Sequence, residues 1–358
     1  MRTITRSAAL LFLSLCLLSC ASTPAILGPD GKPLPGSVSS LEAVRLNGRK
    51  EWISLRGRDA SKPLLLFLSG GPGGSELATV RRTLGALEER FVVAVWDQPG
   101  AGKSFAAIDH DELSLEVYLE DAEALVDLLC GRFKRDKLFV LGESWGSFLG
   151  VLLAQRRPDR IEAFFGTGQM VAFKENDRAC YDLALDWCRQ KGDGKKLAKL
   201  VKQGPPPYYG RKSAARLSAV LLETFDYMRE ALGVRGSGDT IGDILSPEYN
   251  LLDKANWIRG LLASLESFYP KLQELDLRAI APRLEVPSYF LLGRLDVNAS
   301  LPLFLDYYGR LQAPDKEVVW FERSGHTPWS SETGLFVAEL FRLSGVGEEG
   351  ATAHLDNK

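Results

Sequence analysis

Ser144 lies between two glycines at the end of an apolar run, where its hydroxyl could act as a nucleophile. Residues 137–141 read KLFVL, and residues 142–146 read GESWG, which matches the pattern G-x-S-x-G. A helix-like segment follows directly, so the serine would lie in a strand–turn–helix arrangement that is too tight for side chains two positions away on either side. The helix N-terminus would also favour negative charge near the serine. The pattern predicts Ser144 as a nucleophile, the alternative being a turn that merely contains a serine.

A serine hydroxyl needs a general base to remove its proton. The chain contains three histidines. His110 lies in the acidic stretch IDHDELS, and His354 lies four residues from the end of a polar tail. His326 instead follows the last apolar run, 316–322, at the carboxyl end of a strand, where parallel sheets gather their sites. The sequence therefore predicts His326 as the base; a histidine that only caps the final helix is the alternative.

A third residue has to orient the imidazole and stabilise its charged form. Asp296 closely follows the apolar run 288–293 and precedes His326 by 30 positions. None of the rival aspartates ends an apolar run; they are Asp276, Asp306 and Asp315. We therefore expect Asp296 to be the partner of the histidine, which gives the chain order Ser144, Asp296, His326.

An oxyanion formed by attack of the serine would need two backbone N–H donors. One is expected from Trp145, directly after the nucleophile. The other is expected from the loop 69–75, SGGPGGS, which follows the apolar run 63–69 and whose glycines allow a close approach of backbone to substrate. Gly71 is the predicted donor, with Gly70 as the next choice. Glycines that serve only a turn are the alternative.

The elements that must position these residues alternate between strands and helices. Two short strands joined by Asn47-Gly48 predict a hairpin. Later apolar runs are continuous, which is typical of strands covered on both faces, and helical patterns lie between them. The expected strands are residues 41–47, 51–57, 63–69, 91–96, 137–141, 161–168, 288–293 and 316–322. This order predicts an α/β fold with a mostly parallel, doubly wound sheet.

Strand-like runs are interrupted once, after the sixth strand of the predicted core. Residues 172–279 read as helices and loops, and we expect them to form a helical cap. The core would then consist of residues 41–171 and 280–345. The tail, 346–358, is small and polar, and is expected to be loose.

The first 20 residues are typical of an export signal. Arg2 and Arg6 precede a short apolar stretch, and the stretch ends in LLSC, with Cys20 last. Such an ending resembles the lipobox of bacterial lipoproteins, in which the cysteine is acylated and becomes the first mature residue. No Asp follows Cys20, which favours the outer membrane. Cleavage at an ordinary small-residue site, or an uncleaved anchor, are the alternatives. Residues 21–40, rich in Pro, Gly and Ser, predict a flexible tether.

Composition narrows the class of protein further. The 358 residues carry 44 basic and 46 acidic side chains in no long run of either sign, which argues against a nucleic-acid partner. Cys130, Cys180 and Cys188 follow the signal, and an odd number of cysteines does not make a disulfide framework. We expect free thiols, although Cys180 and Cys188 could pair if their helix bends. No metal or organic cofactor is implied, and the oligomeric state is open.

Together these motifs resemble the proline iminopeptidase-like branch of the α/β-hydrolases. The likeness comprises a Gly-Gly-Pro-Gly loop at residues 70–73, the segment WDQPGAGKS at 96–104, G-x-S-W-G at 142–146, G-R-x-D at 293–296 and S-G-H at 324–326. It covers residues 60–170 and 285–343, and it implies the α/β-hydrolase fold with a Ser-Asp-His triad. Two positions depart from the family pattern: Ser69 stands where a histidine usually opens the glycine loop, and Pro99 replaces an arginine.

The same resemblance implies an aminopeptidase that releases N-terminal residues from small or short-peptide substrates. In that family the cap supplies acidic residues that hold the free amine, and Glu223 and Glu248 are the candidates chosen here, among cap glutamates that also include Glu230 and Glu266. Aromatic residues of the cap could line an apolar pocket. The alternatives are an esterase acting on small acyl or aryl esters, since the same machinery serves both, and a non-catalytic lipoprotein that uses the scaffold for binding.

Overall fold

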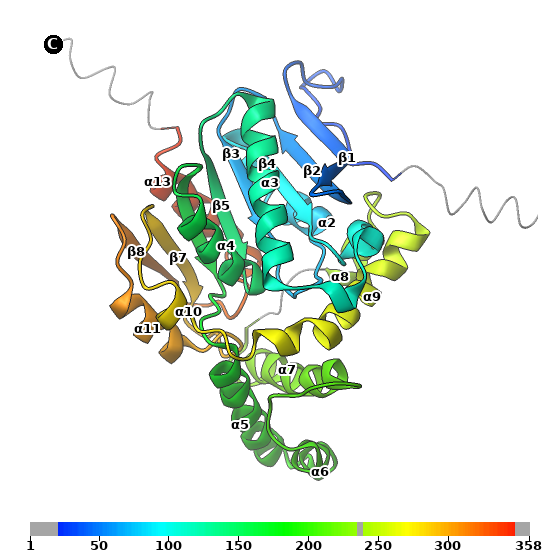
Figure 1. Cartoon of the computed structure of the whole chain (residues 1–358), viewed down its shortest axis with the longest axis vertical. Helices are drawn as coiled ribbons and strands as arrows, with labels where there is room; N and C mark the ends of the chain where they lie inside the picture. Colours follow the sequence, from blue (N-terminus) through cyan, green and yellow to red (C-terminus); the bar gives the residue numbers. More distant parts are fainter. Residues whose placement is uncertain (1–20, 235–238, 348–358) are drawn as a thin grey trace, which may run out of the picture.

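An eight-stranded sheet forms the centre of the protein (Figure 1). The computed structural model describes residues 21–234 and 239–347. In spatial order the strands are β1 (Val38–Leu46), β2 (Arg49–Gly57), β4 (Val92–Asp97), β3 (Leu64–Leu68), β5 (Leu138–Glu143), β6 (Ile161–Thr167), β7 (Ser288–Gly293) and β8 (Lys316–Phe321). β2 pairs antiparallel with β1 and β4, and all other neighbours are parallel. The predicted mostly parallel sheet with a hairpin at its start is confirmed.

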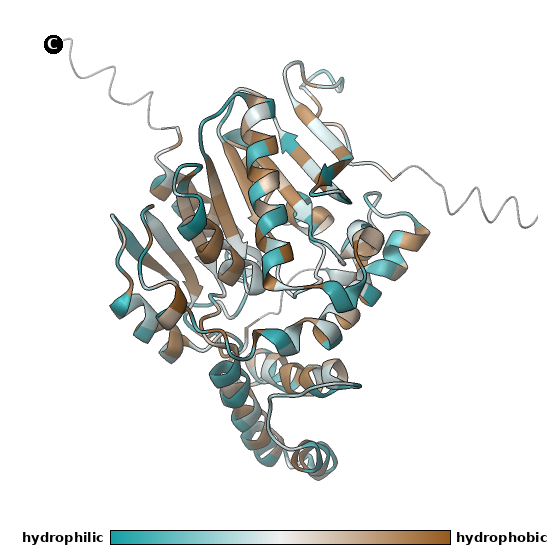
Figure 2. Ribbon diagram, in the orientation of Figure 1, coloured by the Kyte–Doolittle hydropathy of each residue, from teal (hydrophilic) through white to brown (hydrophobic). Residues whose placement is uncertain are grey.

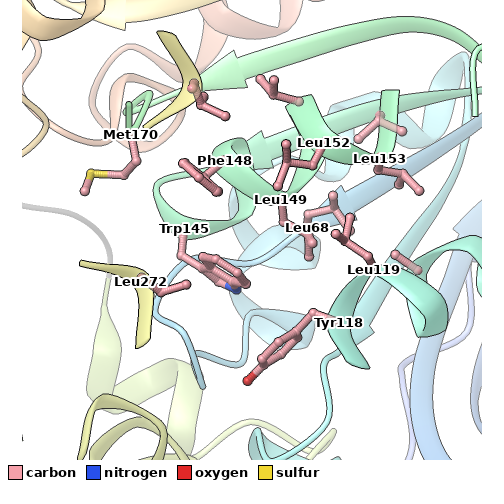
Figure 3. Close-up of a cluster of buried hydrophobic side chains, with 14 of the residues drawn as sticks. Leu68, Tyr118, Leu119, Trp145, Phe148, Leu149, Leu152, Leu153, Met170 and Leu272 are labelled. Atoms are coloured by element: carbon pink, nitrogen blue, oxygen red, sulfur yellow. The ribbon is translucent and has the colours of Figure 1, made fainter. Parts of the chain in front are cut away.

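Helices cover both faces of this sheet, which is why its central strands are apolar except at their carboxyl ends, where β4 ends in Asp97 and β5 in Glu143. All residues of β3, β4, β5 and β7 are buried. One core cluster draws on α3 (Leu115–Phe133), α4 (Trp145–Arg156) and α11 (Leu301–Arg310), and the other on α2 (Leu77–Thr83) and α13 (Thr333–Ser344). Figure 2 shows the hydrophobic strands between these layers, and Figure 3 shows Trp145 and Phe148 of α4 packed in the first cluster. The start of α4, which carries the residue after Ser144, is thus held rigidly.

The cap follows β6, where the sequence predicts it. It contains α5 (Phe173–Lys191), α6 (Gly194–Gln203), α7 (Ser213–Glu230), α8 (Thr240–Ile244) and α9 (Leu251–Ser267), and the chain returns through α10 (Leu277–Ile280) to β7. Figure 1 shows α5, α6 and α7 together at one end of the molecule. The remaining short elements are η1 (Gly85–Glu89), η2 (Gly102–Ala107), η3 (His110–Glu112), η4 (Tyr269–Leu272) and α12 (Pro328–Ser331).

The segment 21–40 differs from the flexible tether that its composition predicts. The Ser22 N–H donates to the Pro247 carbonyl at 3.0 Å, and the guanidinium of Arg56 donates to the Pro24 carbonyl at 2.6 Å. Ile26 is buried, and β1 already begins at Val38. Long-range hydrogen bonds therefore fasten this segment to the core and cap. Among the helices that the structure describes, we find none with the length and apolar character needed to cross a membrane.

Candidate active site

Ser144 occupies the turn between β5 and α4 with a backbone conformation that L-residues rarely adopt. Its φ is 54° and its ψ is −118°, and its N–H donates to the Thr167 carbonyl at 3.0 Å. The flanking glycines leave no room for side chains: a Cβ on Gly142 would lie 2.3 Å from the Gly146 carbonyl oxygen, and one on Gly146 would lie 2.0 Å from that of Leu68. Strain of this kind persists only where the surrounding structure imposes it, and it presents the serine side chain at the rim of the sheet.

Asp296 and His326 lie side by side although 30 residues separate them. The His326 Nδ1 is 2.9 Å from the Asp296 Oδ2. The other carboxylate oxygen, Oδ1, accepts hydrogen bonds from the N–H groups of Asn298 at 2.8 Å and Ala299 at 3.0 Å. Because Oδ1 is already held by two backbone donors, Oδ2 is the oxygen that faces the imidazole, and the carboxylate fixes a proton on Nδ1.

The second imidazole nitrogen of His326 faces another carboxyl group. Nε2 lies 3.8 Å from the Glu143 Oε1. Burial of the ring by itself would lower the pKa of His326, but the charge and hydrogen bond of Asp296, with the charge of Glu143, outweigh it and raise the pKa to about 9. The raised pKa means that the imidazole of His326 takes up a proton more readily than a free histidine does.

Of the two predicted oxyanion donors, Trp145 directly follows Ser144 in the chain, and Gly71 lines the same cavity as Ser144. Trp145 is the first residue of α4, so its N–H has no partner within the helix. Gly71 lines the cavity described below and has a φ of 124°, in the region that favours glycine. Gln98 ties the two segments together: its side chain accepts from the Trp145 indole at 2.9 Å and donates to the Ser69 carbonyl at 3.0 Å. This bridge explains the glutamine of the WDQ segment.

A cavity of about 350 Å³ lies over Ser144, between the core and the cap. Its lining comprises Gly70, Gly71, Gly74, Ser75, Glu76, Glu143, Ser144, Ser218, Leu221, Leu222, Phe225, Trp257, Leu261, Leu265, Asn298 and His326. The side chains from α7 and α9 are mostly apolar, and the charged ones come from the core. Within this described lining, two glutamates face no lysine or arginine. The cavity therefore combines an apolar wall with an acidic floor.

Glu76 and Glu143 form this acidic floor, and sequence reasoning missed both. Burial, together with the charge of Glu143, holds the pKa of Glu76 well above its usual range, and burial also raises the pKa of Glu143. The Glu76 Oε2 is buried with no hydrogen-bond partner in the described structure. Glu143 packs on the Gly70 backbone, where a Cβ would lie 2.0 Å from its Oε2. The charge of His326 acts against the raised pKa of Glu143, and a further cation bound between Glu76 and Glu143 would favour the ionised form of both.

The cap glutamates chosen from the sequence do not reach this cavity. Glu248 is fully buried in an ion pair with Arg81 at 2.5 Å and does not line the cavity over Ser144. Glu223 pairs with Lys196 at 2.7 Å and lines a separate groove on the cap. Each is neutralised by a cation of its own, so neither is available to a ligand beside Ser144. This corrects both assignments.

The remaining histidines, aspartates and cysteines considered from the sequence lie outside the cavity over Ser144 or outside the described residues. The His110 ring is 3.0 Å from the Gly100 carbonyl, and His354 lies outside the described residues. The rival aspartates are used elsewhere: Asp276 and Asp306 pair with Arg278, and Asp315 accepts from Tyr289. Cys130, Cys180 and Cys188 are free and buried, so the prediction of free thiols is confirmed. In the described part of the chain, no group of three or more His, Cys, Asp or Glu residues is arranged to hold a metal ion.

Comparison with known proteins agrees with this architecture. A family model described as the alpha/beta hydrolase fold matches residues 63–246. A probable aminopeptidase of Bacillus subtilis is 28% identical over 321 residues, covering 87% of this chain and 98% of that protein. A probable proline iminopeptidase of Leptolyngbya boryana is 38% identical over 137 residues, 38% of each chain. The crystal structure of the proline iminopeptidase of Mycobacterium smegmatis superposes with a TM-score of 0.63 at 16% identity, covering 86% of this chain and 98% of that one.

Proposed function

Because the chain belongs to the α/β-hydrolase family, with homologues named aminopeptidase and proline iminopeptidase, we propose that it is a serine aminopeptidase acting through an acyl-enzyme. The single observation that carries the choice of substrate is the acidic floor of the cavity over Ser144. A free N-terminal amine is cationic at neutral pH, and it would supply the positive charge that lets Glu76 and Glu143 ionise together.

In the proposed reaction, Ser144 Oγ attacks the carbonyl carbon of the first residue, and its proton passes to His326 Nε2. The N–H groups of Trp145 and Gly71 stabilise the oxyanion, and Asp296 stabilises the imidazolium. The imidazolium then gives the proton to the leaving amine, and the peptide bond breaks. Water, deprotonated by His326, attacks the resulting ester, which releases the N-terminal amino acid and restores the serine hydroxyl.

The apolar wall bears on the side chain of the released residue. Leu221, Phe225, Leu261 and Leu265 come from α7 and α9. A proline ring or a small aliphatic side chain would bury its apolar surface against them, whereas a charged side chain would lose its hydration. The wall and the acidic floor together favour a small apolar N-terminal residue.

We also propose that the protein is exported and held at a membrane, in the outer membrane or at the periplasmic face, by acyl chains on Cys20. The support is the sequence of residues 1–20, with two arginines, an apolar stretch and LLSC. Mass spectrometry of the N-terminal peptide of the protein isolated from membranes tests this proposal, because it shows directly whether Cys20 carries acyl chains.

Substrate pairs test the amine requirement. Prolyl and alanyl arylamides should be cleaved, whereas their N-acetylated forms, which lack the free amine, should not. A butyryl ester has no amine, so its turnover measures the activity of Ser144 and His326 alone. Glu76→Gln should lower kcat/KM for the arylamides by about 10- to 100-fold, mainly through KM, because a hydrogen bond to a charged group is lost. The loss for the ester should be much smaller.

Glu223→Gln is the matched control, since it removes a carboxylate of the cap that already pairs with Lys196. It should leave the arylamide-to-ester ratio unchanged. Ester turnover without arylamide turnover would instead identify the protein as an esterase. Equal cleavage of free and N-acetylated arylamides would show a peptidase whose acidic floor does not bind the amine.

The charge next to His326 predicts a pH dependence. The base must be neutral, and its pKa is raised to about 9, so kcat/KM for the neutral ester should rise with pH and level off above about pH 9. Glu143→Gln removes one negative charge 3.8 Å from Nε2 and should move the midpoint to lower pH. Each unit of that movement raises ester turnover at pH 7 by about tenfold. A pH–rate profile with an unmoved midpoint would contradict the contact between the two groups.

A further inference from the structure

Helix α9 (Leu251–Ser267) is amphipathic, but its polar face is buried and its apolar face is exposed. Its buried positions include four polar or small residues spaced three to four apart, namely Asp253, Asn256, Gly260 and Ser264. The opposite positions, spaced four, three and four apart, are exposed and apolar, namely Leu251, Ala255, Ile258 and Leu262. The three large side chains among them are 55%, 50% and 47% exposed. A surface helix ordinarily turns such a stripe toward the core.

Specific contacts hold the polar face of α9 against the core. Asp253 pairs with Lys103 at 2.5 Å, with side chains that are 11% and 2% exposed. The Trp257 indole donates to the Ser75 carbonyl at 2.8 Å. A Cβ on Gly260 would lie 2.7 Å from a backbone oxygen of the loop that faces it. The helix cannot roll to bury its apolar stripe without breaking a buried ion pair, which is strongly destabilising.

Further large apolar side chains are exposed at α8 and at the start of α9. Ile241 is 72% exposed, Leu245, directly after α8, is 64% exposed, and Leu252 is 53% exposed. The six residues Ile241, Leu245, Leu251, Leu252, Ile258 and Leu262 are called the cap-edge surface below. Figure 2 shows hydrophobic positions along the ribbon of α9. Gathered exposure of this kind marks an interaction surface.

The start of the described chain lies at this same edge. The Ser22 N–H donates to the carbonyl of Pro247, which lies between Leu245 and Leu251 in the sequence. The Thr23 hydroxyl donates to Glu248 at 3.2 Å. Cys20 precedes Ser22 by two residues, a reach of about 7 Å for extended chain. Acyl chains on this cysteine would therefore enter a bilayer next to the cap-edge surface.

We infer that the cap-edge surface rests on the lipid bilayer, with the apolar stripe of α9 in the interface between headgroups and acyl chains. The inference rests on the lipid anchor of the proposed function. From Leu251 to Leu262 the stripe extends about 16 Å along the helix, which suits a helix lying in the plane of the interface. Trp257, Leu261 and Leu265 of the same helix line the cavity over Ser144. One helix would then separate the membrane from the active site.

Site-directed labelling of the acylated protein in vesicles tests this contact. A bimane label on Ile258→Cys should be quenched by doxyl-labelled phosphatidylcholine, because the label would lie among the acyl chains. The matched control is Glu285→Cys, at an exposed position just before β7, at the end of the sheet opposite the cap. It should show no quenching beyond that of vesicles without doxyl lipid. Cys130, Cys180 and Cys188 are buried, and Cys20 is blocked by its acyl chain in the acylated protein, so the label reports on the introduced cysteine.

A second measurement uses the chain from residue 20 onward with Cys20→Ala, which carries no acyl group. Its partition onto vesicles of phosphatidylcholine and phosphatidylglycerol should fall by about tenfold or more in the triple variant Leu251→Ser, Ile258→Ser, Leu262→Ser. Butyryl ester turnover in solution should be retained, because none of these residues lines the cavity over Ser144.

The possible outcomes distinguish a failure of the membrane contact from a failure of the lipid anchor on Cys20. If mass spectrometry finds no acyl group on Cys20, the anchor fails, and with it the reason for this orientation. If Cys20 is acylated but the label at position 258 is not quenched, the membrane contact alone is overturned. A label that is shielded without lipid, in a protein of twice the monomer mass by light scattering, would show that a second copy covers the surface, which also overturns the inference.

Discussion

Replacing Ser144 with alanine is expected to abolish turnover of both arylamide and ester substrates, by a factor of at least about 10⁴ in kcat. The Ser144 hydroxyl is the only protein group in the proposed reaction that forms a covalent bond to the substrate carbonyl carbon, so the acyl-enzyme cannot form without it. Residual hydrolysis would come from binding and from the N–H groups of Trp145 and Gly71 acting on a water molecule. A fluorophosphonate probe should label the native protein and leave the variant unlabelled.

The control for this variant is Ser147→Ala, in the same turn. The Ser147 hydroxyl donates to the Ser144 carbonyl at 2.6 Å and accepts from the Met170 N–H at 3.1 Å. Its loss perturbs the packing of the turn but leaves the nucleophile in place, so the adduct should persist. Both variants should unfold at temperatures close to that of the native protein. A probe adduct that survives in Ser144→Ala would place the nucleophile elsewhere and refute the proposed chemistry.

The residues around Ser144 could be inferred from the sequence because strands constrain them. Ser144, Asp296 and His326 each follow an apolar strand closely, and the carboxyl ends of parallel strands meet at one edge of a sheet. The glycines at 142 and 146 were predicted for lack of space, and the backbone atoms found 2.0 to 2.3 Å from their missing Cβ atoms give the reason. Hydrophobic periodicity and the order of the elements along the chain are local features of the sequence, so they can be predicted from it.

The acidic floor of the cavity could not be predicted from the sequence in the same way. Glu143 occupies a variable position of the G-x-S-x-G pattern, and Glu76 follows a glycine loop whose path depends on its packing against β5 and the cap. Their shared burial is a consequence of that path. A carboxylate inside the nucleophile turn, with no basic residue near it in the sequence, is the one signal that could have drawn attention to position 143.

The candidates chosen within the cap were wrong because residue type alone does not show which way a side chain points or what it pairs with. Glu223 and Glu248 were selected by residue type, yet Lys196 and Arg81 neutralise them. The inverse amphipathicity of α9 shows the same difficulty, since its period predicts a helix but the usual assumption would bury the wrong face. The segment 21–40 was misjudged for a related reason: Pro, Gly and Ser indicate loose chain, whereas hydrogen bonds to Arg56 and Pro247 order it.

Asp296→Asn is expected to lower kcat by about 10⁴-fold with little change in stability, and the hydrogen bonds around this residue explain why. Oδ1 accepts from the N–H groups of Asn298 and Ala299, so an asparagine side chain must keep its oxygen there. Its NH₂ group then faces His326 Nδ1 and donates to it. The imidazole is forced to carry its proton on Nε2, which can no longer take the proton of Ser144.

The loss of the negative charge of Asp296 also lowers the pKa of His326, and this effect can be measured separately. The charge of Asp296 is a main reason that the pKa of His326 is raised to about 9. In Asp296→Asn the pKa should fall, so that residual ester turnover no longer rises between pH 7 and 9. Asp306→Asn, at the rival aspartate that pairs with Arg278, should keep both rate and profile. Because the asparagine preserves the shape of the site, a native-like rate in Asp296→Asn would mean that the imidazole is oriented by another group, for which Glu143, 3.8 Å from Nε2, would be the candidate.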